Sequence, residues 1–152
     1  MTRDDDRRQP HLAPAELALM EQLWVGGRQT ARALREALYP GSTKAQHGTV
    51  QRLLQRLEDK GFVRRDAALP VHLFEAAVSR EAYGGEQLES LADKLTGGSL
   101  APLLTHLVDE RRISGDEIAR LRRVLDDASR ATGTGRAIET GRAVEAEEGE
   151  DS

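Results

Sequence analysis

Residues 46–65 read QHGTVQRLLQRLEDKGFVRR and combine an amphipathic helix, a glycine stop and the beginning of a strand. Apolar residues recur at i, i+3, i+4 and i+7, which predicts a helix with one buried face formed by Val50, Leu53, Leu54 and Leu57. Gly61 suits the left-handed position that commonly follows a helix. The polar side chains of the outer face can hydrogen-bond base edges and phosphates. The segment therefore predicts a DNA recognition helix over about Gln46–Lys60.

Composition excludes several classes of protein. A chain of 152 residues without cysteine forms one compact domain or two small ones, with no disulfide, thiolate metal site or cysteine nucleophile. No apolar run approaches the ~20 residues of a membrane span. The first ten residues, MTRDDDRRQP, contain no apolar region of the kind found in secretion signals. We expect a cytoplasmic protein without membrane insertion.

The net charge of −4 is unevenly distributed. Residues 131–152 carry two arginines against six acidic residues, which accounts for the whole of it. Residues 44–65 carry six basic residues against two acidic ones. A local basic patch on a neutral body is compatible with DNA binding, although charged helices are also often merely solvated.

Two helices are expected before the recognition helix and a hairpin after it. The first helix runs from about Pro14 to Val25 and ends at a Gly-Gly pair, and the second begins after Thr30, a suitable N-cap. Phe62 begins a short strand, and Val71–Ala76 forms its partner across a turn. Three helices and a hairpin describe a winged helix-turn-helix, with core fillers Trp24, Phe62 and Phe74.

Three further leucine-striped helices are expected from Ser79 onward. They are separated by Gly97-Gly98 and by a capping box that begins at Ser114. Alone they would be marginally stable, so we expect them to form a homodimer, although they could instead fold back on their own chain. The expected interface residues are Leu88, Leu91, Leu95, Leu100, Leu103, Leu104, Leu107, Ile118, Leu121 and Leu125.

The fold is thus expected to be mainly α, with a winged helix-turn-helix DNA-binding domain over residues 13–77 and a three-helix dimerisation region over residues 78–130. A disordered N-terminus over residues 1–12 and a disordered acidic tail over residues 131–152 flank them, because few large apolar groups occur there. The Gly84-Gly85 pair is expected to loosen or kink the first of the later helices.

From about Leu12 to Asp127 the sequence resembles the penicillinase-repressor-like winged-helix regulators, the family of β-lactamase and methicillin-resistance repressors. The resemblance is carried by HGTVQRLLQRLEDKGFVRRD, by SREAY at residues 79–83 and by LADKLTGGSLAPLLTHLVDE. It implies a homodimeric repressor that binds a palindromic operator of double-stranded DNA. It also implies a membrane sensor protease, or its downstream protease, as a partner. Cleaved members carry an Asn-Phe pair where this chain has His106-Leu107, and copper-responsive members carry C-terminal cysteine pairs that it lacks.

The candidate DNA-binding residues lie on the recognition helix and at the start of the wing. The resemblance places Thr49 and Arg52 at positions that face the major groove, where arginine can pair with guanine. Arg56 is expected to contact phosphate. The full candidate set is Gln46, His47, Thr49, Gln51, Arg52, Gln55, Arg56, Arg64 and Arg65.

Motifs for catalysis or metal binding are absent from the sequence. No two of the four histidines have the i, i+4 spacing of a helical zinc pair, and no nucleophile elbow or phosphate-binding glycine loop occurs. We therefore expect neither an enzyme nor a cofactor or metal site. Two alternatives remain, which are a ligand-sensing winged-helix regulator and a helical protein-interaction module that does not bind DNA.

Overall fold

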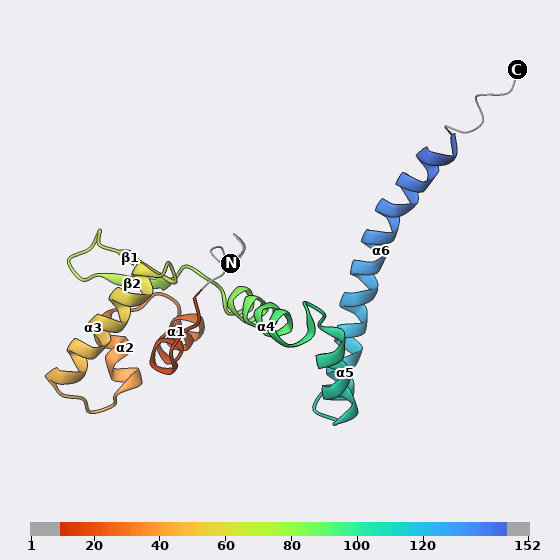
Figure 1. The fold of residues 1–152 in the computed structure, drawn as a ribbon. Helices are drawn as coiled ribbons and strands as arrows, with labels where there is room; N and C mark the ends of the chain where they lie inside the picture. Colours follow the sequence, from red (N-terminus) through yellow and green to blue (C-terminus); the bar gives the residue numbers. More distant parts are fainter. Residues whose placement is uncertain (1–9, 146–152) are drawn as a thin grey trace, which may run out of the picture. The chain divides into compact units, whose positions relative to one another are not determined.

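The computed structural model describes residues 10–145, with side chains described over residues 10–133. The chain divides after Ser99 into two compact units (Figure 1). The first unit contains α1 (Pro14–Gly26), α2 (Ala31–Leu38), α3 (Lys44–Asp59), β1 (Val63–Asp66), β2 (Leu73–Ala76) and α4 (Arg80–Thr96). The second contains α5 (Ala101–Asp109) and α6 (Gly115–Glu145).

The first unit has the order of a winged helix-turn-helix, so the predicted fold class is confirmed. β1 and β2 form an antiparallel hairpin in which Arg64 pairs with Glu75. Gln29 adds a single bridge, since its N–H donates to the Phe74 carbonyl at 3.0 Å and its own carbonyl accepts from Phe74 at 2.8 Å. The hairpin lies beside α3 (Figure 1).

Local capping explains where α2 and α3 begin and end. The Thr30 hydroxyl accepts from the Ala33 N–H at 3.1 Å, which confirms the predicted N-cap. α3 begins at Lys44, two residues before the predicted start, because the Gln46 side chain accepts from the Thr43 N–H at 3.0 Å. Gly61 takes φ +82°, as predicted for the residue after the helix.

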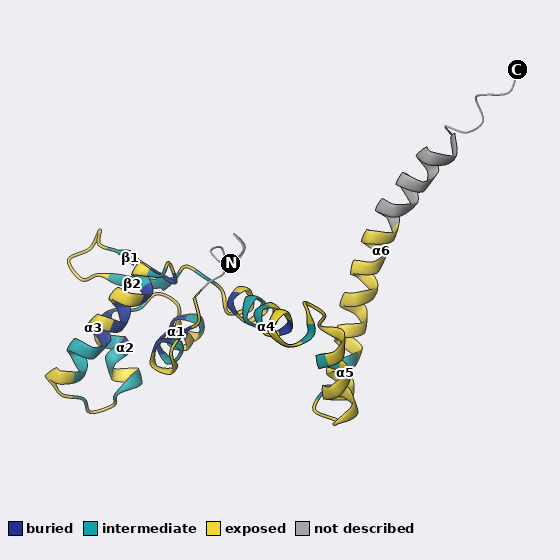
Figure 2. Cartoon of the chain, in the orientation of Figure 1, coloured by how far each residue is buried: buried dark blue, intermediate teal, exposed yellow. Residues whose placement is uncertain are grey.

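The apolar stripe of α3 lies at the centre of the core (Figure 2). It packs against apolar residues of α1 and α2 and against both rings of the hairpin region, Phe62 and Phe74. The four residues of the stripe are 0–6% exposed: Val50, Leu53, Leu54 and Leu57. Trp24, the third predicted core ring, is only half-buried and packs at the edge of this cluster.

α4 also joins this core, although the sequence grouped it with the helices that follow. Tyr83 is 7% exposed and meets Phe62 edge-on, with ring centroids 5.7 Å apart. The hydroxyl of Tyr83 accepts from the Leu12 N–H at 3.0 Å. Leu12, expected in the disordered N-terminus, is therefore a core residue with 2% exposure. The rest of that predicted segment, residues 1–9, lies outside the described residues.

The second unit is much less buried than the first. No residue of α5 is buried, and the same holds for α6 as far as residue 133. α6 continues to Glu145, beyond residue 130 where the sequence predicted a disordered tail. α6 contains no proline, because the last proline of the chain is Pro102, so glycine is the only strong helix breaker within it. The remainder of the predicted tail, residues 146–152, lies outside the described residues.

An ion pair with a buried carboxylate joins α1 to the C-terminal end of α3. Lys60 Nζ, just after α3, lies 2.8 Å from Glu16 Oε2 in α1, and the Glu16 side chain is 4% exposed. Burial would raise the pKa of this carboxyl. The hydrogen bonds from Lys60 and the Ala13 N–H, together with the charges of Lys60 and Arg56, outweigh burial and hold the pKa below its ordinary value of 4.5.

We predict that Lys60→Met destabilises the protein by about 2 kcal/mol, because it leaves the buried Glu16 carboxylate with only the Ala13 N–H as a partner, while the partial exposure of Lys60 keeps the effect below that of a fully buried pair. A carboxyl whose pKa is lowered by folding stabilises the fold above its unfolded pKa, and this contribution disappears as the pH falls through the folded pKa. Urea unfolding at pH 7 and at pH 3 should therefore show a large effect of Lys60→Met at pH 7 and a smaller one at pH 3. An effect of equal size at both pH values would contradict the role assigned to the ion pair.

Candidate nucleic-acid interface

The outer face of α3 is open to solvent. Arg52 lies opposite the buried stripe, and within the described part of the chain it forms no hydrogen bond or ion pair. One turn earlier, a Cβ at Gly48 would meet no atom within 4 Å. One turn later, Gln55 Nε2 donates to Asp59 Oδ1 at 2.9 Å. An arginine is thus available at the centre of a helix face with no bulky neighbour on its N-terminal side.

Two polar candidates near the start of α3 are held by the helix itself. The Gln46 amide oxygen accepts from Thr43, so its orientation is fixed and its NH₂ group remains as a donor. The Thr49 hydroxyl donates to the Ala45 carbonyl at 3.3 Å. Its oxygen can still accept a hydrogen bond, and its methyl group remains available for apolar contact.

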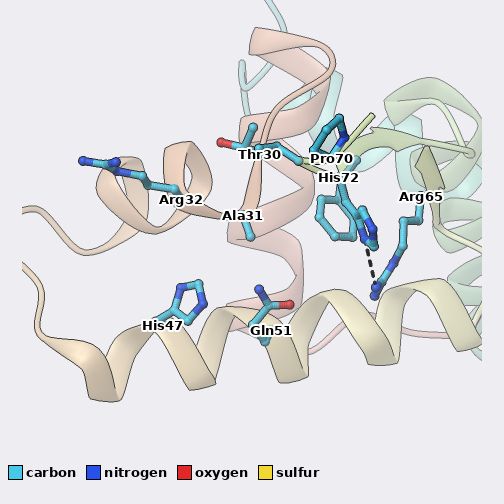
Figure 3. A pocket seen from close by; sticks show the side chains of 10 residues that line it. Thr30, Ala31, Arg32, His47, Gln51, Arg65, Pro70 and His72 are labelled. Carbon is cyan, nitrogen blue, oxygen red and sulfur yellow. Dashed lines mark hydrogen bonds between the residues drawn. The ribbon is translucent and has the colours of Figure 1, made fainter. Parts of the chain in front are cut away.

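His47 and Gln51 lie on a flank of α3 rather than on its outer face. Both line an open cavity of about 510 Å³ between α2, α3 and the hairpin, here called the cationic groove (Figure 3). None of its lining residues is acidic, whereas two are arginines and two are histidines. The lining residues are Thr30, Ala31, Arg32, His47, Gln51, Arg65, Pro70, Val71, His72 and Phe74. The lining itself carries no carboxylate, although Arg32 pairs with Glu36 at 3.2 Å and Arg65 pairs with Glu58 at 3.1 Å outside it.

The two arginines of β1 differ in their availability. Arg65 Nη2 lies 3.1 Å from Glu58 Oε2, and the guanidinium lies 5.0 Å from the centroid of the Phe74 ring. Its side chain is 28% exposed, so it mainly fastens β1 to the end of α3. Arg64 is 68% exposed, and its Nε lies 3.6 Å from Glu75 Oε1. Arg56, on α3, is exposed.

Another arginine near the hairpin is neutralised by its neighbours. Arg28 lies 3.2 Å from Asp66 Oδ2 and 3.1 Å from Glu75 Oε2. These contacts attach the segment before α2 to the hairpin. Arg28 is 52% exposed, yet two carboxylates already offset its single charge.

Sequence reasoning missed Arg32 and His72 as residues of the cationic groove. Arg32 could have been found from its place in the first turn after the Thr30 cap. His72 could not, because its position depends on how the hairpin folds back toward α2.

The predicted dimer-interface residues form exposed apolar surface in both units. On α4, Leu88, Leu91 and Leu95 are 43%, 47% and 66% exposed. In the second unit an apolar groove of about 260 Å³ lies between α5 and α6 and is lined by Leu104, Val108, Ile113, Ile118, Leu121, Arg122, Leu125 and Asp126. Leu100 and Leu107 are exposed, and Leu103 is half-buried. Contiguous apolar surface of this kind is typical of an interaction site.

Neither a metal cluster nor a membrane span occurs in the described part of the chain. Among those residues, no three histidine, aspartate or glutamate side chains are grouped so that they could hold a metal ion. None of the helices found there has the length and apolar character needed to cross a bilayer.

Comparison with known proteins agrees with this geometry. The sequence model of the penicillinase repressor family matches residues 12–127, from the segment before α1 into α6. The penicillinase repressor of Bacillus licheniformis is 23% identical over 118 residues, which are 78% of this chain and 91% of that protein. The resemblance carried by the recognition helix and the leucine-rich segment is thereby confirmed. The chain belongs to the penicillinase repressor family.

Proposed function

We propose that this chain is a homodimeric transcriptional repressor that places α3 in the major groove of a palindromic operator. The observation that carries the proposal is the exposure of Arg52 opposite a fully buried apolar stripe. An α-helix fits the major groove, and an arginine that projects from it can donate two hydrogen bonds to guanine. Thr49, one helical turn before Arg52 on the same side, is the second candidate for base contact.

The basic residues around Arg52 are suited to phosphate contacts. Lys44 and Arg56 flank it on opposite sides of α3, and Arg64 extends the positive surface onto β1. Between α3 and the hairpin, the cationic groove adds two histidines and Arg32, an exposed arginine whose Nε also lies 3.2 Å from Glu36 Oε1. One DNA strand can therefore run over this groove while α3 contacts the bases.

The exposed leucines of α4, α5 and α6 are the basis for proposing a homodimer. A single chain leaves these apolar residues in contact with water. Pairing two copies about a twofold axis would bury them and present two α3 helices to two half-sites. The position of the family's cleaved Asn-Phe pair falls in α5, where this chain has His106 and Leu107, so cleavage at that pair is not part of this proposal.

Base readout is tested by Arg52→Ala. Its side chain is exposed, so we expect the melting temperature to change little. On an operator selected by the wild-type protein from random duplexes, binding should weaken by about 1–3 kcal/mol, with relaxed preference at one base pair per half-site. Fluorescence anisotropy on the operator and its single-base variants measures both effects. Unchanged binding to every sequence would show that this face of α3 does not contact the bases.

Phosphate contact is tested by the dependence of binding on salt. With about four phosphate contacts per protomer, the dimer makes about eight, and log K should fall with log salt at a slope near −7. Arg64→Ala should weaken binding to all sequences alike and make this slope less steep. Arg123→Ala is the matched control, because it removes the same charge from an exposed arginine of α6, outside the proposed DNA-binding surface. An equal loss of slope in both variants would contradict this distinction.

Dimerisation is tested by charge introduced into the apolar faces. Sedimentation equilibrium at micromolar concentration should show a dimer for the wild type and a monomer for a Leu91→Asp and Leu125→Asp double variant. Leu69→Asp is the control, since Leu69 is 55% exposed in the hairpin loop and belongs to none of these helices. A monomeric wild type, or a dimeric double variant, would exclude the proposed interface.

A further inference from the structure

The first turns of α4 are anchored to the DNA-binding core through Tyr83. Its hydroxyl accepts from Leu12, and its ring meets Phe62 edge-on. Phe62 lies three residues after the end of α3, and its N–H donates to the Leu57 carbonyl at 2.8 Å. Tyr83 therefore connects α4 to the C-terminal end of the proposed recognition helix.

Contacts around Trp24 hold the same end of α4. Trp24 Nε1 donates to the Val78 carbonyl at 2.8 Å, one residue before the Ser79 cap. The Arg80 guanidinium lies 5.5 Å from the centroid of the Trp24 ring, and that ring lies 6.3 Å from Tyr83. The direction in which α4 leaves the core is thus set by several independent contacts.

Gly84 and Gly85 follow immediately after this anchor. Both are inside α4 and exposed, and a Cβ at either would meet no atom within 4 Å. Neither has a left-handed backbone, so no turn or close approach requires glycine there. Glycine in a helix interior is less favourable than alanine and leaves the backbone freer to bend. Beyond the pair, one exposed contact joins α4 to the N-terminal segment, between His11 Nδ1 and Gln87 Oε1 at 2.9 Å. The pair therefore makes α4 more compliant between its buried anchor and the leucines that follow.

The exposed leucines of α4 lie on the far side of this compliant point. Leu88, Leu91 and Leu95 belong to the proposed dimer interface. At a rise of 1.5 Å per residue, Leu95 lies roughly 15 Å along the helix from Gly85. A bend of about 10° at the glycines would move it by roughly 3 Å, close to the ~3.4 Å rise of one base pair.

We propose that Tyr83 and the Gly84–Gly85 pair together determine which spacings between half-sites the dimer accepts. Tyr83 restricts the direction of α4 relative to α3, and the glycines widen the range of distances that two recognition helices can span. The inference rests on the proposed function, because it requires a dimer that binds two half-sites. It assigns a specificity role to residues that touch neither bases nor phosphates.

Two variants with opposite expected effects test the inference. They are measured on the selected operator and on duplexes with one base pair inserted or deleted at its centre. The Gly84→Ala and Gly85→Ala double variant should stiffen α4, so its preference for the selected spacing should increase several-fold. Tyr83→Phe removes the acceptor of the Leu12 N–H but keeps the ring, so its preference should decrease, with affinity for random DNA unchanged.

Gly133→Ala is the control for helix stabilisation alone. Gly133 lies in α6, and a Cβ there would also meet no atom within 4 Å. This variant should keep the wild-type spacing preference. Equal preferences in the wild type, the double alanine variant and Tyr83→Phe would overturn the inference while leaving the proposed function intact. A wild-type protein that is monomeric, or that shows no preference for paired half-sites, would overturn both.

Discussion

The rotation of α3 about its own axis is the constraint on which the DNA-binding surface depends. Four apolar side chains on one face of α3 are almost completely removed from water. Each contributes roughly 1.5–3 kcal/mol when buried, so turning the helix by one residue would cost several times that amount. It would also move a charged side chain toward the core. The outward direction of Arg52 therefore follows from the packing of residues that never contact DNA.

The basic residues near α3 have different roles, which a count of charges does not reveal. Lys60 is committed to Glu16, and Arg65 is committed to Glu58 and the Phe74 ring. Lys60 connects the end of α3 to α1, and Arg65 connects β1 to α3. Lys44, Arg52, Arg56 and Arg64 remain on the exposed surface. The positive surface offered to a partner is thus smaller and more localised than the sequence indicates.

Local sequence patterns were sufficient to predict the winged helix-turn-helix. The spacing of Val50, Leu53, Leu54 and Leu57 identified the buried face, and Thr30 and Gly61 marked helix ends, because these signals act within one or two turns. The patterns did not reveal what each side chain contacts. Tyr83 meets partners 21 and 71 residues away, at Phe62 and Leu12.

The candidate site was predicted less completely than the fold, for the same reason. The outward position of Arg52 follows from helix periodicity alone. The ion pair between Arg65 and Glu58 depends on how β1 lies against α3. The position of His72 depends on the course of the hairpin. The separation of His47 and Gln51 from the outer face also required the positions of α2 and the hairpin. These features depend on contacts between segments far apart in the sequence, and local patterns in a single sequence do not reveal such contacts.

The lack of buried residues in α5 has a consequence for the lifetime of the protein in the cell. Under the proposed pairing, a newly made chain has a folded first unit, while its second unit gains most of its stability only when it meets another copy. Segments of low local stability open often, and open segments are the ones that proteases and chaperones engage. Unpaired chains would then be removed faster than paired ones. A modest fall in synthesis would lower the amount of active protein more than proportionally.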